Sequence, residues 1–217
     1  MNWEEARFNM VEQQIRPWDV LDQQILELLF EVRREEFVPE ANRALAFVDM
    51  ELPLPCGKKM WQPKLEARVV QELAVKVSDK VLQIGVGSGY LAALLAKRAQ
   101  HVYCVELHPD MKTFAEGNLK RAGIGNVTVE QGDGARGWSK QAPYDVIVVT
   151  GSLPIAPEEL EQQLAKGGRL FYVQGELPVM SGTLVTRGDH GALSSVKLFE
   201  TALSPLEHAP QPERFKF

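Results

Sequence analysis

The stretch Val81-Leu82-Gln83-Ile84-Gly85-Val86-Gly87-Ser88-Gly89-Tyr90 decides the fold. Residues 80–84 form a short, mainly apolar run that is typical of a buried strand, and glycines follow at positions 85, 87 and 89. The small and apolar residues at 91–97 predict a helix packed on that strand. Residues without a Cβ in such a turn let the backbone approach a ligand closely and let the helix lie near the strand. The sequence therefore predicts a strand–turn–helix unit with a ligand at its turn.

The alternation of strands and helices continues beyond this unit. Residues 145–150 are almost wholly apolar, as expected for a central strand covered on both faces. Residues 157–166 begin with a proline and two acidic residues and end with a lysine before Gly167, which are helix start and stop signals. The pattern predicts an α/β fold with a doubly wound, mostly parallel sheet and helices on both faces. The other predicted elements are helices at 69–74 and 109–122 and strands at 101–105, 127–130, 170–173, 183–186 and 196–203, the later ones antiparallel at an edge.

The residues before the sheet follow a different pattern. Apolar positions at 20–32 recur at helical spacing, and Pro17 before them fits a helix entry. Residues 49–63 contain three prolines and a glycine with no clean period, which predicts an ordered loop. Met10, Val11 and Ile15 are expected to pack in the core, although aromatic residues around them could also line a pocket.

We expect one domain, because 217 residues fit a size of about 150 residues per domain with some elaboration. Within residues 1–217 the sequence divides into an N-terminal helical and loop region at 1–66, a sheet core at 67–203 that carries the ligand, and a tail at 204–217. The end of the tail, 209–217, is expected to be a poorly ordered end or a strap on the surface.

Composition excludes several classes of protein. The chain has 24 Lys and Arg against 29 Asp and Glu, a formal charge of −5, which argues against a protein that mainly holds nucleic acid. It contains no apolar run long enough to span a bilayer, and its first residues lack the pattern of a secretory signal. Two cysteines are too few for a disulfide framework, and none of the four histidines has metal-like spacing, so each is expected to be an ordinary surface or packing residue. We therefore expect a cytoplasmic protein with no bound metal, nucleic acid or membrane; the sequence says nothing about its oligomeric state.

Two carboxylates follow the next two predicted strands. Glu106 ends the second strand, 21 positions after Gly85, and Asp133 follows the third. The carboxyl ends of parallel strands meet at one edge of the sheet, where ligands of open α/β sheets bind. A carboxylate at position 106 can accept hydrogen bonds from both ribose hydroxyls of a nucleoside, and Asp133 can meet its adenine.

The glycine spacing indicates which nucleoside binds. A dinucleotide fingerprint would require a third glycine at position 90, which is Tyr90, and no catalytic Tyr-Lys pair is evident, so an NAD-dependent oxidoreductase is disfavoured. The pattern Gly-x-Gly-x-Gly instead resembles the S-adenosylmethionine (SAM) site of class I methyltransferases. That resemblance implies a Rossmann-like doubly wound sheet, here with a helical N-terminal extension.

A closer resemblance covers nearly the whole chain. The sequence resembles protein-L-isoaspartate O-methyltransferases, which methylate the stray carboxylate of isoaspartyl residues in damaged proteins. The matching positions are Met10-Val11, Gln14-Ile15, residues 32–39 (Val-Arg-Arg-Glu-Glu-Phe-Val-Pro), Asp49, Gln62-Pro63, residues 81–90, Asn126-Val127, residues 132–134, Gly137-Trp138, residues 142–145, Gln163-Leu164, residues 167–169, Gly175 and residues 204–206.

The resemblance implies which residues bind the cofactor and the acceptor. The cofactor would be SAM, and the partner an isoaspartyl peptide or protein covered by a substrate loop at 57–63. The implied cofactor-binding residues are Gln83, Gly85, Gly87, Ser88, Gly89, Glu106, Leu107, Asp133 and Gly134, and the implied substrate-loop residues are Gly57, Lys58, Lys59, Met60, Trp61 and Gln62.

This chain departs from the family within the substrate loop. The family reads approximately Gly-Gln-Thr-Ile-Ser-Gln-Pro-Tyr, whereas this chain reads Gly-Lys-Lys-Met-Trp-Gln-Pro-Lys from Gly57 to Lys64. The family's active-site hydroxyl therefore falls on Trp61, whose indole is bulkier and offers a single N–H donor. Gln83 also replaces an acidic residue near the methionyl end of SAM, and Phe47 stands where the family usually has an aromatic hydroxyl.

These departures leave three hypotheses for the function. The chain methylates isoaspartyl residues; or Trp61 and the lysines mark a different, small-molecule acceptor that is flat or anionic; or the chain binds SAM without isoaspartyl activity. Trp61 could equally pack against the domain, with the lysines as solvated loop charges. Methyl transfer to a carboxylate needs no general base, because a carboxylate of pKa about 4 is ionised at neutral pH.

Overall fold

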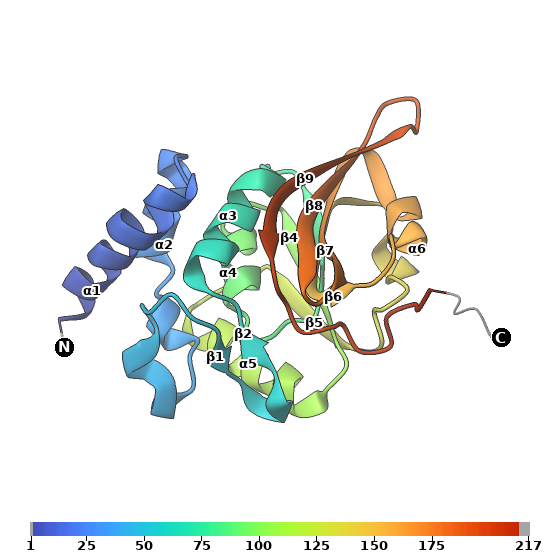
Figure 1. Ribbon diagram of the computed structural model, residues 1–217. Helices are drawn as coiled ribbons and strands as arrows, with labels where there is room; N and C mark the ends of the chain where they lie inside the picture. The colour runs from blue at the N-terminus through green and yellow to red at the C-terminus, as the bar shows by residue number, and fades with distance from the viewer. Residues whose placement is uncertain (1, 213–217) are drawn as a thin grey trace.

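A seven-stranded sheet forms the centre of the computed structural model, which describes residues 2–212 (Figure 1). In the order in which they lie side by side, the strands are β5 (Val127–Gln131), β4 (His101–Glu106), β3 (Lys80–Ile84), β6 (Tyr144–Leu153), β7 (Leu164–Glu176), β8 (Val179–Arg187) and β9 (Leu193–Thr201).

The sheet has the predicted mixed character. The strands from β5 to β7 pair in parallel, and β8 and β9 add an antiparallel edge. The chain runs from β3 outward through β4 to β5 and then returns to place β6 on the other side of β3. This reversal lies between β3 and β6, where open α/β sheets bind their ligands.

Helices cover both faces of the sheet, as predicted. On one face, Val81, Val102 and Val146 are buried in a core that includes the apolar side chains of three helices. On the other face, Leu82 and Ile147 pack with Leu160 from a single short helix. The three helices of the first face are α3 (Pro63–Leu73), α4 (Tyr90–Ala96) and α5 (Pro109–Arg121), and the short helix is α6 (Glu158–Gln162).

The N-terminal helices pack beside α3 (Figure 1). They are α1 (Trp3–Met10), a π-helical segment at Val11–Ile15 and α2 (Gln23–Glu31). Met10, Val11 and Ile15 are fully buried, which confirms their predicted place in the core.

Several predicted boundaries are wrong in detail, and three of them have a clear physical reason. The helix expected at 157–166 ends at Gln162, because Leu164 pairs with Tyr144 and begins β7. The helix expected at 20–32 begins only at Gln23, since the side chain of Asp22 accepts the backbone N–H of Gln24 and caps it. The loop at 49–63 contains a small antiparallel pair of strands, β1 (Leu52–Pro53) and β2 (Lys59–Met60), and Pro63 already belongs to α3.

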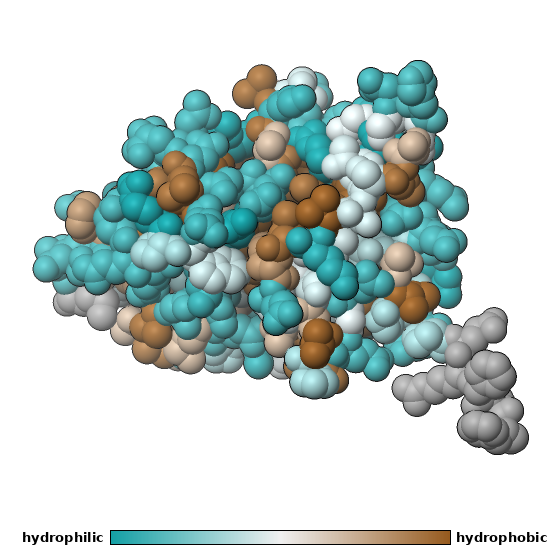
Figure 2. Space-filling model, turned by 45° about the horizontal axis from the view of Figure 1, so that its top comes forward, coloured by the Kyte–Doolittle hydropathy of each residue, from teal (hydrophilic) through white to brown (hydrophobic). Residues whose placement is uncertain are grey.

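No helix within residues 2–212 is long and apolar enough to cross a membrane. On the face drawn in Figure 2, hydrophobic side chains form small patches among hydrophilic ones. Part of the tail that the sequence treats as an end or strap, residues 213–217, lies outside the described residues.

Candidate cofactor and acceptor site

An open cavity lies at the carboxyl ends of β3, β4, β5 and β6, and its empty space, counted together with the open solvent at its mouth, is about 920 Å³. We call it the main cavity. Ten of the residues that the sequence assigns to the site line it, from the glycine turn, from the ends of the next two strands and from the substrate loop. They are Gly57, Lys58, Lys59, Trp61, Gly85, Gly87, Glu106, Leu107, Asp133 and Gly134.

The glycine turn brings the backbone to the cavity wall. Gly85, Gly87 and Gly89 have φ angles of +81°, +55° and +85°, a region that side chains with a Cβ rarely adopt. A Cβ at Gly134, across the cavity floor, would lie 2.8 Å from a side-chain carbon of Ile84. The cavity wall thus favours glycine for two reasons. The turn needs it for its backbone conformation, and position 134 needs it for space.

Glu106 is a fixed acceptor at the cavity wall. One of its carboxylate oxygens accepts the backbone N–H of Val86 from the glycine turn at 3.0 Å, and the other accepts that of His108 at 3.0 Å. The residue is 6% exposed. Each oxygen retains a further lone pair, so the carboxylate can still accept from a ligand hydroxyl.

Asp133 lines the main cavity at the end formed by the residues that follow β5. Its Oδ1 accepts the backbone N–H of Ala135 at 3.0 Å, and its Oδ2 lies 2.6 Å from Nδ1 of His208. The Ala135 hydrogen bond, with a smaller contribution from His208, lowers the pKa of Asp133 below its usual range. This carboxylate is therefore ionised at neutral pH and presents a negative charge at that end of the cavity.

A second, smaller cavity adjoins the main one, and its empty space, counted with the open solvent at its mouth, is about 330 Å³. The residues that line both cavities are Lys59, Trp61, Gly85, Gly87 and Thr150. Three further residues that the sequence assigns to the site line the second cavity alone, namely Met60, Gln83 and Ser88. The assigned residues thus divide between two adjoining spaces that share one wall.

Gln83 carries an orphaned acceptor at the second cavity. Its Nε2 donates to the carbonyl of Gly85 at 2.9 Å, and the residue is 1% exposed. Its buried Oε1 has no hydrogen-bond partner among the residues that the structure describes. Because an unpaired buried acceptor is costly, a ligand N–H at this position would satisfy it.

Two assigned residues lie outside both cavities. Gly89 precedes the first residue of α4, and a Cβ there would come within 3.3 Å of the Ala115 carbonyl in α5. Glycine at this position therefore allows the start of α4 to pack closely against α5. Gln62 immediately precedes α3 and makes no side-chain capping bond.

Trp61 is part of the core as well as of the cavity wall. It is 6% exposed, and its ring meets that of Phe171 edge-on at 6.4 Å between centroids. Its Nε1 donates to the backbone carbonyl of Thr150 at 3.0 Å. The indole has no other donor, so it can shape the wall but has no hydrogen bond left for an acceptor carboxylate.

A buried ion pair fixes the loop that carries Trp61. Arg34 is fully buried, pairs with the buried Glu66 of α3, and donates to the Trp61 carbonyl at 2.5 Å and the Ala46 carbonyl at 2.9 Å. Burial lowers the pKa of Arg34 to about 10, which leaves the guanidinium charged at neutral pH. Sequence reasoning assigned no role to Arg34 or Glu66.

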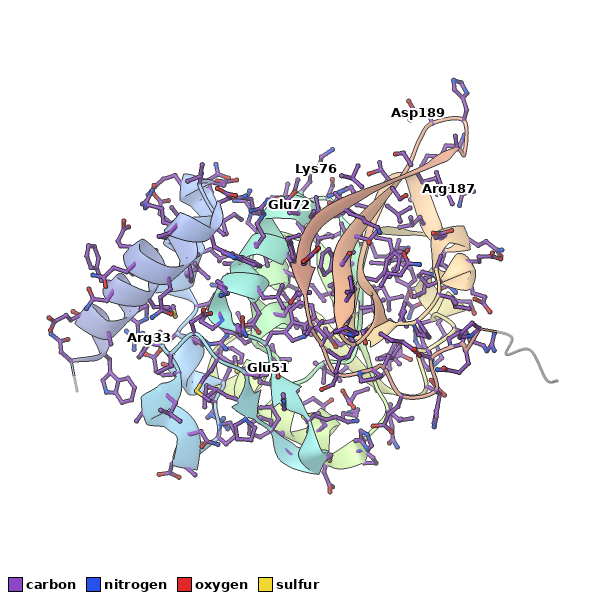
Figure 3. The ribbon with its side chains drawn as sticks, in the orientation of Figure 1. Arg33, Glu51, Glu72, Lys76, Arg187 and Asp189 are labelled. Carbon is purple, nitrogen blue, oxygen red and sulfur yellow. The ribbon has the colours of Figure 1, made fainter. Side chains whose placement is uncertain are left out.

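The lysines of the substrate-loop region all contact carboxylates. Lys59 lies 2.9 Å from Glu51, a residue beside the β1–β2 hairpin that is labelled in Figure 3. Lys64 lies 2.6 Å from Asp49, and Lys58 pairs with a glutamate of the C-terminal segment, Glu207. One interpretation of the sequence took these lysines to be solvated loop charges. Each of them instead forms an ion pair with a carboxylate.

Several residues at the main cavity were missed by sequence reasoning. The segment 203–207 forms one side, although the sequence places residue 203 at the end of the sheet core and residues 204–207 in the tail, and assigns none of them to the site. His108 lines the cavity and contacts Glu207 at 2.8 Å, whereas sequence reasoning expected an ordinary surface or packing residue and gave it no place at the site. The position of His108 two residues after Glu106 was the one available signal. The residues that the structure describes contain no group of three or more His, Cys, Asp or Glu placed to hold a metal ion.

Comparison with known sequences identifies the family of this chain. A profile of the family described as "Protein-L-isoaspartate(D-aspartate) O-methyltransferase" matches residues 5–193. A protein-L-isoaspartate O-methyltransferase of Koribacter versatilis is 36% identical over 200 residues, which cover 92% of this chain and 90% of the relative. One of Protochlamydia amoebophila is 44% identical over 166 residues, which cover 76% and 79% of the two chains.

Solved structures share the fold. A Plasmodium falciparum structure, described as a protein-L-isoaspartate O-methyltransferase in complex with S-adenosyl-L-homocysteine (SAH), superposes with a TM-score of 0.77 at 20% identity over 95% of this chain and 99% of its own. A second protein-L-isoaspartate O-methyltransferase gives a TM-score of 0.78 at 27% identity, covering 94% of this chain and 65% of its own. The chain belongs to the protein-L-isoaspartate(D-aspartate) O-methyltransferase family of SAM-dependent methyltransferases.

Proposed function

We propose that this chain transfers the methyl group of SAM to the carboxylate of isoaspartyl residues in proteins, with SAM held in the main cavity. The observation that carries the proposal is Glu106, a buried carboxylate fixed by two backbone N–H groups beside the glycine turn. Relatives that are 36–44% identical are named protein-L-isoaspartate O-methyltransferases, which supports the choice of acceptor.

The chain offers suitable partners for each part of SAM. The Glu106 carboxylate would accept from the ribose hydroxyls, and Asp133 with Gly134 would lie at the adenine end. With the methionyl end of SAM extending past the shared wall into the second cavity, which Gln83 lines, the orphaned Oε1 of Gln83 would accept from the methionyl ammonium. Gln83 is a neutral amide, whereas the family has an acidic residue at this position. Its contact with the ammonium would therefore be a hydrogen bond without an ion pair.

SAM supplies an electrophilic methyl group on a sulfonium when bound. The residues of this chain then need to orient the acceptor and exclude water, because a carboxylate of pKa about 4 is already a nucleophile at neutral pH. Trp61 and Thr150 line both cavities and so form the wall at which donor and acceptor would meet. Trp61 would exclude water there without donating a hydrogen bond, because its N–H is bound to the Thr150 carbonyl.

Methyl transfer to a pair of peptides tests the proposal. Purified protein is incubated with methyl-labelled SAM and either an isoaspartyl peptide or the matching aspartyl peptide, and base-labile methanol is counted. We expect label with the isoaspartyl peptide only. No label with either peptide, while SAH still binds in a calorimeter, would overturn the acceptor assignment and direct the search to small molecules or to a SAM-binding protein without turnover.

We also propose a cytoplasmic location. Both cysteines are free: Cys56 is exposed in the loop before Gly57, and Cys104 is buried in β4. Unpaired thiols are typical of reducing compartments. Fractionation with an antibody to the chain would test this, and recovery outside the cytoplasmic fraction would contradict it.

A further inference from the structure

The C-terminal segment 203–208, here called the strap, crosses the carboxyl ends of the sheet beside the main cavity. Its first half is fixed on β6 by Ser152, whose backbone N–H donates to Ser204 at 3.0 Å and whose carbonyl accepts from Leu206 at 3.0 Å. A Cβ at Gly151 would lie 2.7 Å from the backbone of Leu206. In Figure 1 this dark red segment follows β9 along the lower edge of the sheet. The strap thus begins from a rigid base.

The second half of the strap is held by side chains. The Glu207 carboxylate pairs with Lys58 Nζ of the substrate loop and lies 2.8 Å from His108 Nε2, and His208 contacts Asp133 at 2.6 Å. His108 follows the Glu106 strand end, whose carboxylate accepts its backbone N–H. One carboxylate therefore joins three segments that are distant in sequence: the strap, the substrate loop and the edge that carries Glu106.

We propose that Glu207 is a positioning residue that holds the strap closed over the main cavity and, through Lys58, orders the substrate loop when the strap is closed. The inference rests on the proposed function in one respect, namely that SAM occupies the main cavity. It assigns Glu207 no contact with reacting atoms. Its consequence is that cofactor retention and the order of the substrate loop depend on the same side chain.

The exposure of these groups indicates what kind of effect to expect. The side chains of Lys58 and Glu207 are 37% and 38% exposed, and ion pairs at such exposure contribute little to global stability. The Lys58 hydrogen bond, followed by that of His108, holds the pKa of Glu207 at about 2, so the carboxylate stays ionised at neutral pH. Loss of Glu207 should therefore release the strap and loop locally and leave the fold intact.

The substrate loop gives a direct readout of this coupling. Two backbone hydrogen bonds close the turn next to Lys58: Leu54 N–H to the Lys58 carbonyl at 2.8 Å, and Lys58 N–H to the Pro55 carbonyl at 3.2 Å. If Glu207 orders the loop, these amides will exchange hydrogen faster without it. Exchange of the peptide that spans 54–60 can be followed by mass spectrometry in the full chain.

The test compares Glu207→Ala with a matched variant, Glu31→Ala. Glu31 pairs with Lys97 at 2.6 Å, at exposures of 58% and 37%, and lies outside both cavities. We expect Glu207→Ala to weaken SAH binding about two- to fivefold and to accelerate loop exchange, and Glu31→Ala to do neither. A double-mutant cycle with Lys58→Met should show that the two changes are not additive, as expected for groups that act through each other.

The outcomes separate this inference from the proposed function. Loop exchange in Glu207→Ala equal to that in Glu31→Ala would overturn the proposal, whatever happens to SAH affinity. Additive effects of Glu207→Ala and Lys58→Met would also overturn it. Neither measurement requires methyl transfer, so failure of the isoaspartyl assay would leave both results interpretable.

Discussion

The two sides of the main cavity are specified in different ways. On the sheet side, the glycine turn, Glu106 and Asp133 each follow directly from a strand, and their places are fixed by the backbone next to them. On the opposite side, the substrate loop and the strap meet through Lys58 and Glu207, which are 149 residues apart. Local rules predict the first side, whereas the second depends on pairs that only the folded chain brings together.

The same difference appears in how each side is held. Glu106 is positioned by backbone N–H groups, which any residue other than proline at positions 86 and 108 would supply. Trp61 is positioned by the side chain of Arg34 beneath it and by the Thr150 carbonyl beside it. The sheet side should therefore tolerate substitution of neighbours, and the loop side should be sensitive to distant residues.

The largest expected effect is on the buried pair under the loop. Arg34→Met leaves the buried carboxylate of Glu66 without its partner, and we expect the free energy of unfolding to fall by about 3–5 kcal/mol. Urea denaturation measures it. The double variant Arg34→Met, Glu66→Leu should recover most of this loss, because it removes both charges together. A loss below about 1 kcal/mol for Arg34→Met alone would show that the pair does not anchor the loop.

Trp61→Ser should have the next largest effect. Removing a buried indole leaves a cavity, and we expect a loss of about 3 kcal/mol in the free energy of unfolding. Isoaspartyl turnover should rise, because the ring narrows the shared wall of both cavities and serine both opens that wall and supplies a free hydroxyl donor, which outweighs the lost exclusion of water. Phe171→Leu is the matched control, since Phe171 contacts the ring and lines neither cavity. A rise in turnover with Phe171→Leu as well would mean that loosened packing, and not an opened wall, is responsible.

On the sheet side, Glu106→Ala should weaken SAH binding. The expected change in the free energy of binding is smaller than the changes in the free energy of unfolding expected for Arg34→Met and Trp61→Ser. Loss of hydrogen bonds from ribose hydroxyls to a carboxylate corresponds to about 2–3 kcal/mol, or roughly 30- to 160-fold in the dissociation constant. Calorimetry with Glu130→Ala, near the end of the neighbouring strand and outside the main cavity, provides the comparison. Unchanged affinity in Glu106→Ala would refute the placement of SAM.

These two sides also show how far sequence reasoning reached. The order of strands and helices, the glycine turn and the carboxylates after β4 and β5 could be predicted, because period, glycine spacing and position after a strand are local signals. The roles of Arg34, Glu66 and Glu207 could not be predicted, because their partners are distant in sequence. Nothing near Arg34 indicates a buried partner 32 residues away, and nothing near Lys58 indicates one 149 residues away. Leu164 was placed in a helix for a related reason: its pairing with Tyr144 in the sheet is a tertiary contact that local helix signals do not contain.

The smallest expected effect concerns the two native cysteines. Their reactivity reports on the loop side and on the sheet side of the cavity without any substitution in either. Cys56 is exposed immediately before the substrate loop, whereas Cys104 is buried in β4, where burial raises the pKa of its thiol above the usual range. Because the thiolate is the reactive form, Cys104 should stay unreactive at neutral pH. An aromatic disulfide reagent should therefore modify one thiol in the native protein and the second only in denaturant, and Cys56→Ser should abolish the first reaction. Comparable native rates for both thiols would show that β4 opens as readily as the loop, and the contrast between a rigid sheet edge and a side-chain-held loop would then fail.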